Sequence, residues 1–120
     1  MRRQVGSGAK WEDIAGYSRA VRVGNRIEVA GTTCEGATAA DQLRGAIDII
    51  EGALVELGAS LSDVVRTRMY VTDIRGWEPI ARAHGDAFGA IRPATAMVEV
   101  SALVEPWMRV EIEATAIVDP

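Results

Sequence analysis

The stretch IRPATAMVEVSALVEPWMRVEIEATA, residues 91–116, decides the fold. Apolar and other side chains alternate in it, which predicts two β-strands, over about 94–100 and 107–118, with a short connection between them. Successive side chains of a strand point to opposite faces of the sheet. In the second strand one face carries Met108, Val110, Ile112, Ala114 and Ala116, and the other carries Arg109, Glu111, Glu113 and Thr115. The pattern therefore predicts a sheet with one apolar face and one charged face.

Two further segments are expected to divide between the same faces. In the strand over 94–100, the residues expected on the apolar face are Ala96, Val98 and Val100, and those on the charged face are Thr95, Met97 and Glu99. The segment VVRTRMYVT, residues 64–72, is rich in β-branched and aromatic residues and predicts another strand. Its apolar face is expected to hold Val65, Thr67, Met69 and Val71, with Arg66, Arg68 and Tyr70 opposite.

Two helices and a hairpin complete the pattern. TAADQLRGAIDIIEGALVELG, residues 38–58, has an apolar stripe at steps of three and four residues, formed by Leu43, Ile47, Ile50, Leu54 and Leu57. A second, weaker helix is expected over 73–91. The two alternating runs around Gly24-Asn25 predict a hairpin, because these residues accept the positive φ angles of a tight turn. The order is ββαβαββ with both helices on one face of the sheet, which is an α+β fold.

Composition limits the possible partners and cofactors. The 120-residue chain has a net charge of −4, so no attraction to nucleic acid or to an anionic membrane is expected. It has no apolar run of about 18 residues and no signal-peptide core at its N-terminus. Its one cysteine, Cys34, fits a reducing cytoplasm, and its one histidine, His84, is too distant in sequence to suggest a zinc site. We expect a loosely held lead-in over residues 1–13 and a single cytoplasmic domain over 14–120.

The charged face of the sheet has two interpretations. It could be a solvated surface with ion pairs across neighbouring strands, each contributing about 0.2–1 kcal/mol. It could instead meet other copies of the chain and line a polar cleft, because two helices cannot cover both faces of such a sheet. The periodicity of the sequence does not choose between water and a partner subunit.

Three segments, IAGYSRAVRVGNRIEVAGTT, GASLSDVVRTRMYVTDI and RPATAMVEVSALVEPWMRVEIEATA, resemble the Rid family of reactive intermediate deaminases, also called YjgF-like or L-PSP proteins. The likeness runs from about Ile14 to Val118. It implies a chorismate-mutase-like (bacillus-type) fold that assembles as a homotrimer, with a small-molecule cleft between neighbouring subunits. It also implies hydrolysis of reactive enamines and imines, such as 2-aminoacrylate and 2-iminobutyrate, to a keto acid and ammonia without a metal or cofactor.

The resemblance assigns roles to individual residues. Tyr17 matches a tyrosine at the family's cleft, and Gly31 matches a glycine whose backbone approaches the ligand. Glu111 matches the glutamate that positions or activates water, and Met97 matches a position, commonly cysteine, that contributes through its backbone. Thr95 stands where the family has an arginine that holds the substrate carboxylate by a forked, charge-assisted pair of hydrogen bonds.

The threonine at this position changes the expected substrate. Thr95 can donate one hydrogen bond but carries no charge, and hydrogen bonds to charged groups contribute about 1.5–3 kcal/mol. A 2-imino acid held by its carboxylate is therefore an unfavourable substrate. Arg92 could supply the missing charge if its loop folded back, although a surface or subunit-contact role is favoured. Cys34 is not favoured as a nucleophile because no histidine lies near it in sequence, and His84 is expected to pack within its helix face.

Two functions are compatible with these residues. The first is an enzyme that hydrolyses a reactive imine, enamine or related small metabolite, with Glu111 orienting water. The second is a non-catalytic metabolite-binding trimer that acts as a sensor or pathway accessory. Whether the protein is an enzyme is left open. An endoribonuclease is disfavoured, because an acidic chain with one histidine and no stripe of Lys and Arg has little to hold RNA.

Overall fold

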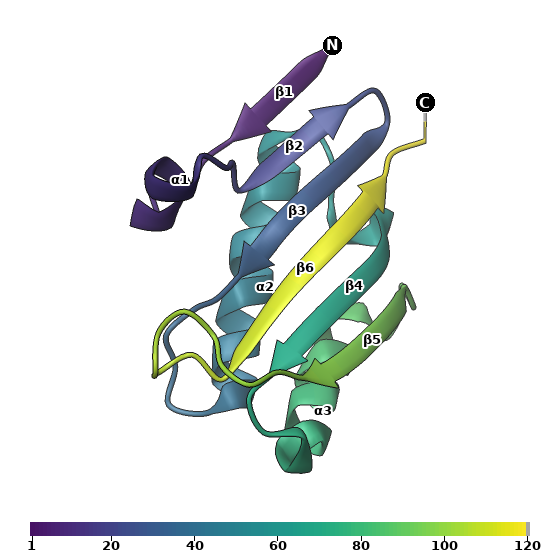
Figure 1. Ribbon diagram of the computed structural model, residues 1–120. Helices are drawn as coiled ribbons and strands as arrows, with labels where there is room; N and C mark the ends of the chain where they lie inside the picture. Colours follow the sequence, from purple (N-terminus) through teal and green to yellow (C-terminus); the bar gives the residue numbers. More distant parts are fainter. Residues whose placement is uncertain (120) are drawn as a thin grey trace.

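The computed structural model describes residues 1–119 and shows an α+β fold built on one six-stranded sheet (Figure 1). The strands lie in the order β1-β2-β3-β6-β4-β5, and helices α2 and α3 cover one face. The strands are β1 Arg2–Val5, β2 Ala20–Val23, β3 Arg26–Thr32, β4 Val64–Val71, β5 Ala94–Glu99 and β6 Val110–Ile117. The α-helices are α1 Lys10–Ala15, α2 Ala39–Glu56 and α3 Trp77–Phe88, and two 3₁₀ turns are η1 Leu61–Asp63 and η2 Ile74–Gly76. The predicted α+β class is confirmed.

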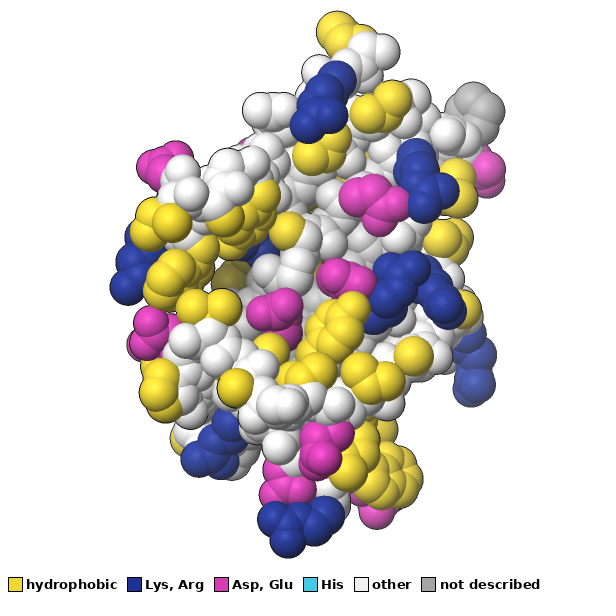
Figure 2. Space-filling view, viewed as in Figure 1, with side chains coloured by type: hydrophobic (Ala, Val, Ile, Leu, Met, Phe, Trp, Pro, Cys, Tyr) yellow, Lys and Arg dark blue, Asp and Glu magenta, His cyan; other side chains and the backbone are white. Residues whose placement is uncertain are grey.

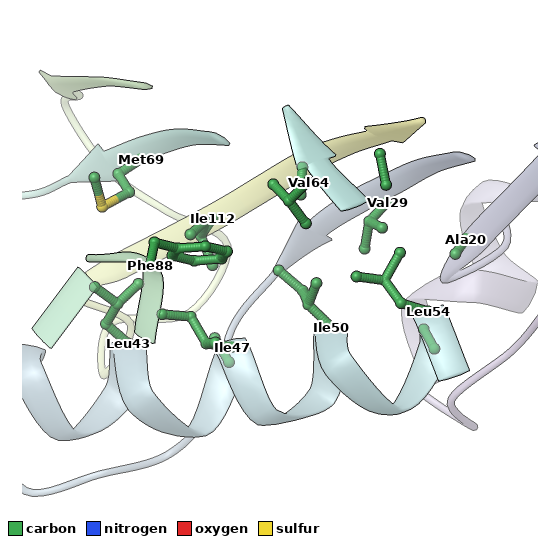
Figure 3. Close-up of a cluster of buried hydrophobic side chains, with 14 of the residues drawn as sticks. Ala20, Val29, Leu43, Ile47, Ile50, Leu54, Val64, Met69, Phe88 and Ile112 are labelled. Atoms are coloured by element: carbon green, nitrogen blue, oxygen red, sulfur yellow. The ribbon is translucent and has the colours of Figure 1, made fainter. Parts of the chain in front are cut away.

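Helix α2 forms for the local reasons that its sequence indicates. The Thr38 side chain accepts a hydrogen bond from the Asp41 backbone N–H at 3.1 Å, which satisfies one of the unpaired donors of the first turn. Its apolar stripe is buried against the sheet, where Ile50 and Leu54 face Val29 of β3 (Figure 3). The helix ends before Gly58, whose φ of 82° is in the left-handed region.

The faces predicted for the strand over 94–100 were wrong. Strand β5 pairs in parallel with β4, and the register sets Thr95 beside Thr67 and Met97 beside Met69. Thr67 and Met69 are buried under the helices, so Thr95 and Met97 point to the helix face, and Val98 lies on the uncovered face. β5 is the edge strand, and apolar residues occur on both of its faces. Its alternation therefore could not show which face is covered.

A β-bulge overturns the predicted burial of Val65. The pairing of β4 with β6 shifts between Val64 and Arg66, which places one extra residue in β4. Val64 is consequently buried, and Val65 is 44% exposed. The strand regains the predicted alternation from Thr67 onward, because the bulge is confined to its start.

The N-terminal residues have structure where the sequence analysis expected a loosely held lead-in. Residues 2–5 form β1, which pairs with β2 in an antiparallel register from Arg2 opposite Val23 to Val5 opposite Ala20. Helix α1 follows and ends at Gly16, which has a φ of 75°. The short and largely exposed strand RRQV has no apolar alternation that could have revealed it. None of the helices in residues 1–119 has the length and apolar character needed to cross a membrane.

Candidate functional site

A contact between Gly31 and Glu111 lies on the uncovered face of the sheet. The pairing of β3 with β6 is irregular between Val29 and Thr32, and this bulge contains Gly31. A Cβ atom added to Gly31 would overlap the carboxylate of Glu111, which comes from β6. A side chain at position 31 would have to displace this carboxylate, so glycine suits the close approach.

The environment of Glu111 favours its protonated form more than water does. The side chain is half-buried, and this burial raises the pKa of the carboxyl above its ordinary value. The negative charge of Glu113 raises this pKa further, and the positive charge of Arg19 opposes both effects. A carboxylate with a raised pKa is a stronger base than an exposed one, which suits it to accept a proton from water.

Arg19 organises the residues around Glu111 and was missed in the sequence analysis. It is 5% exposed, and its Nη1 donates to the carbonyl of Gly31 at 2.6 Å and to Thr32 Oγ1 at 2.8 Å. Its Nη2 donates to the hydroxyl of Tyr17 at 3.3 Å and lies 3.6 Å from a carboxylate oxygen of Glu12. A buried arginine with this many partners fixes the backbone and side chains that it touches. No periodicity marked it, because it lies just before β2 in the connecting segment.

Tyr17 therefore lies beside the Gly31–Glu111 contact. The Arg19 guanidinium carbon lies 5.5 Å from the centroid of the Tyr17 ring as well as binding its hydroxyl. Tyr17 also lines a cavity of about 490 Å³ on the uncovered face, between β1, β2 and β3 and the side chains of Arg68 and Glu113. The structure thus groups three of the predicted site residues, Tyr17, Gly31 and Glu111, around Arg19.

The rest of the charged face carries cross-strand contacts. Tyr70 donates from its hydroxyl to Glu113 at 2.9 Å, and Arg68 lies 3.5 Å from the same carboxylate oxygen. The bond to Glu113 raises the pKa of Tyr70. Acidic and basic side chains lie close together over the middle of this face in Figure 2. Glu113, and not Glu111, is therefore the carboxylate that pairs with arginine on β4.

Thr95 and Met97 lie in a different place. They line a cavity of about 450 Å³ beside β5, together with Met69 of β4 and Trp77 of α3. This cavity is on the helix face of the sheet. Glu111 lies opposite Tyr70 in the register of β6 and β4, and its side chain points to the uncovered face. One copy of the chain therefore does not bring Thr95 and Met97 together with Glu111 in a single site.

Arg92 does not compensate locally for the threonine. It is exposed, its backbone N–H donates to the carbonyl of Phe88 at 2.8 Å, and its φ is 59°. It belongs to the turn that follows α3 and is absent from the lining of both cavities. A left-handed φ is uncommon for a residue other than glycine. Here it belongs to the tight turn between the end of α3 and Pro93, which the hydrogen bond to Phe88 closes.

The remaining candidates, Cys34 and His84, are packed against neighbouring side chains and backbone. Cys34 is half-buried with its sulfur packed against Gly45 of α2, where an added Cβ would overlap it. His84 is 8% exposed, and its ring centroid lies 4.7 Å from that of Phe88, so that it packs as expected. Within residues 1–119, no group of three or more His, Cys, Asp or Glu side chains is arranged to hold a metal ion.

Comparisons with known proteins agree on one family. The family model described as Endoribonuclease L-PSP matches residues 8–118. A RutC family protein of Pyrococcus abyssi is 34% identical over 111 residues, which are 86% of this chain and 87% of that protein. An uncharacterized protein of Streptomyces coelicolor is also 34% identical, over 95% of this chain and 90% of its own length.

Solved structures show the same relationship. Rv2704 of Mycobacterium tuberculosis, described as a member of the YjgF/YER057c/UK114 family, is 54% identical and superimposes with a TM-score of 0.97 over 98% of this chain and 100% of its own. NMB1025 of Neisseria meningitidis, a member of the YjgF family, is 28% identical with a TM-score of 0.85, over 100% of this chain and 97% of its own. Fold, family model and relatives therefore lead to one conclusion: the chain belongs to the Rid/YjgF (L-PSP) family.

Proposed function

We propose that this protein forms a homotrimer with small-molecule clefts between subunits, and that it hydrolyses a small reactive imine or enamine there without a metal or cofactor. The observation that carries this proposal is the carboxylate of Glu111. It is half-buried, its pKa is raised, and it lies against a glycine backbone on a sheet face that no helix covers. This environment suits a general base, and Glu113, two residues along the same face, lines the cavity of about 490 Å³ there.

The placement of Thr95 supports a cleft made by two copies. Thr95 and Met97 on the helix face are at the β5 edge of the sheet, and Glu111 is on the uncovered face. A ligand that contacts both sets needs the edge of one copy against the uncovered face of another. In a closed ring of three copies each uncovered face meets a neighbour, which also removes the half-buried charged face from water.

The proposed reaction is the addition of water to a C=N bond. Glu111 accepts a proton from water, the water oxygen bonds to the imine carbon, and the nitrogen takes up a proton. In the resulting carbinolamine the hydroxyl proton moves to the nitrogen, the C–N single bond breaks to release ammonia, and the C=O bond forms. Imine and water give carbonyl compound and ammonia, so atoms and electrons balance with no further reactant. An enamine enters the same sequence after a proton moves to its carbon.

The alternative is a trimer that binds a metabolite in the same clefts without turnover. The observation in its favour is that threonine occupies position 95, because a site without a cation there lacks the carboxylate anchor that the family resemblance implies. Ribonuclease activity, named in the family description, is not proposed for this chain. Its only histidine is buried against Phe88, and its net charge is −4.

Assembly is the first test of the proposal. Light scattering at micromolar concentration should give a mass three times that of the 12.8-kDa chain. The uncovered face with its cross-strand charges would then be internal, so the assembly should persist at high salt. A monomer under these conditions would contradict the intersubunit cleft as a whole.

Substitution of Thr95 tests the anchor. The natural protein should hydrolyse 2-iminobutyrate, generated in situ by an amino-acid oxidase, poorly or not at all. Thr95→Arg should raise this rate by about tenfold or more, since a charge-assisted bond to a carboxylate contributes about 1.5–3 kcal/mol. Thr95→Gln, which adds a long polar side chain without charge, serves as the control and should not raise the rate. Full activity of the natural protein on this anionic substrate would show that another residue holds the carboxylate.

A further inference from the structure

The cavity beside β5 has a largely apolar lining with two polar side chains. Its volume is about 450 Å³, within the usual range for small-molecule sites. Met69, Met97 and Trp77 supply apolar surface from three elements, and Trp77 remains 52% exposed at the opening. The polar side chains of its lining are Thr95, which is exposed, and His84, which is buried.

These polar groups are joined by a chain of hydrogen bonds through Thr67. Thr67 Oγ1 donates to Thr95 Oγ1 at 2.7 Å, and it lies 2.8 Å from His84 Nε2. A threonine hydroxyl has one hydrogen, so the contact with His84 requires the Nε2–H form of the imidazole to donate to Thr67. Burial lowers the pKa of His84, which keeps the ring neutral and in agreement with this arrangement.

The chain of hydrogen bonds leaves one donor for a ligand. The hydrogen of the Thr95 hydroxyl is given to no other group in residues 1–119. Thr95 serves as the acceptor for the buried hydroxyl of Thr67, and its own hydrogen is not used in that bond. Because Thr95 is exposed and lines the cavity, this hydrogen is available to a group bound there.

The charges around the cavity disfavour an anion. No Lys or Arg side chain lines it. The carboxylate of Glu99 accepts a hydrogen bond from the backbone of Ile74 at 3.0 Å, so a negative charge lies next to the wall that Ile74 forms. The nearby cation of Arg75 is held by Asp73 at 2.9 Å. A carboxylate placed in this cavity would lose water without gaining a cation.

We propose that this cavity selects an uncharged carbonyl compound or imine with a short apolar chain, whose oxygen or nitrogen accepts a hydrogen bond from Thr95 while the chain packs against Met69, Met97 and Trp77. This inference rests on the proposed function in one respect: the cavity would be the substrate-selecting half of the cleft. It adds the substrate class, namely compounds that lack a carboxylate, and it assigns Thr67 and His84 as positioning residues for the Thr95 hydroxyl.

The test compares two probes of the same carbon skeleton, 2-oxobutanamide and 2-oxobutyrate, which differ in charge. Binding is followed in the intact assembly through the indole N–H signals of the three tryptophans in ¹H–¹⁵N spectra. We expect the amide to shift the Trp77 signal, to leave Trp11 unchanged, and to bind at least tenfold more tightly than the acid. Thr95→Val removes the donor at constant size and should weaken amide binding by about 3- to 10-fold.

Two matched variants separate a positioning role from a merely structural one. Thr95→Ser keeps the hydroxyl and should bind the amide within about threefold of the natural protein. Thr67→Val, which keeps the size and removes the link to His84, should weaken amide binding in the same direction as Thr95→Val. If Thr67→Val fails to fold, the difference in amide binding between Thr95→Val and Thr95→Ser still decides whether the hydroxyl at position 95 binds the ligand. Equal binding of acid and amide, an unmoved Trp77 signal, or unchanged amide binding by Thr95→Val would each overturn the inference.

The outcome is separable from that of the proposed function. A Trp77 response with the expected preference for the amide, in a protein that hydrolyses no imine, would overturn the enzyme and retain this site. Hydrolysis that depends on Glu111, without any preference for the uncharged probe, would overturn this site and retain the enzyme.

Discussion

Replacing Glu111 by glutamine should lower imine hydrolysis by about 10²–10⁴-fold, because glutamine keeps the size of the side chain but cannot accept a proton from water. Small uncharged imines generated in situ by an amine oxidase are the substrates to use, with ammonia release as the measurement. The assembly should be unchanged in mass. The variant should also be at least as stable as the natural protein at pH 7, because the folded state raises the pKa of Glu111 and so disfavours its charged form.

The pH dependence of the natural protein provides a second measurement on the same group. The base form of Glu111 is lost as the pH falls through the raised pKa, so turnover should rise with pH and reach a plateau above that value. The matched control is Glu113→Gln, two residues along the same face. Glu113 is held by Tyr70 and Arg68, so this variant should retain most of the turnover. Equal losses in the two variants, or turnover that survives in Glu111→Gln, would contradict the assignment of Glu111 as the base.

Replacing Arg19 by methionine should destabilise the folded chain by about 3–5 kcal/mol, which is the cost of leaving a buried partner charge without its counter-ion. Arg19 and Glu12 are both largely buried, and Arg19 also satisfies the carbonyl of Gly31. Burial raises the pKa of Glu12, but hydrogen bonds from Ser7, together with the positive charge of Arg19, hold it below its ordinary value in the natural protein. Urea unfolding followed by circular dichroism measures the change.

Arg26→Met is the control for this substitution. Arg26 pairs with Glu28 at 2.7 Å, but both side chains are more than half exposed, so its loss should cost no more than about 1 kcal/mol. In the Arg19 variant the pKa of Glu111 should rise further, because the opposing positive charge is removed. The rise of turnover with pH should therefore move to higher pH. A shift to lower pH, or a stability equal to that of the control variant, would show that Arg19 does not act on this site.

The elements that the sequence predicted well depend on short-range interactions. The helix expected over 38–58 is found as α2, Ala39–Glu56, because the cap at Thr38 and the apolar stripe act within a few turns of the same segment. The alternation of β6 was also predicted correctly, since β6 lies in the sheet interior between β3 and β4 and has one face covered by α2.

The errors have a common origin in long-range pairing. The face of Thr95 depends on the register of β5 against β4, and the exposure of Val65 depends on a bulge opposite β6. Arg19 and Thr67 showed no functional signal, because the contacts that join them to Gly31 and Thr95 span 12 and 28 residues of the chain. The grouping of Tyr17, Gly31 and Glu111 could be anticipated from the family resemblance, although the arginine that joins them could not.

The sequence by itself determined the α+β class, the order of elements over residues 14–118, the family and the absence of a cation at position 95, because each of these depends on local periodicity or on residue identity. Only the tertiary structure decided that Glu111 and Thr95 face opposite sides of the sheet. It also decided that the charge of Arg19 acts on Glu111 and that His84 is linked to Thr95 through Thr67. The physical reason is that a one-residue change of register moves a strand side chain to the other face, and register is fixed by the neighbouring strands and not by the strand's own residues.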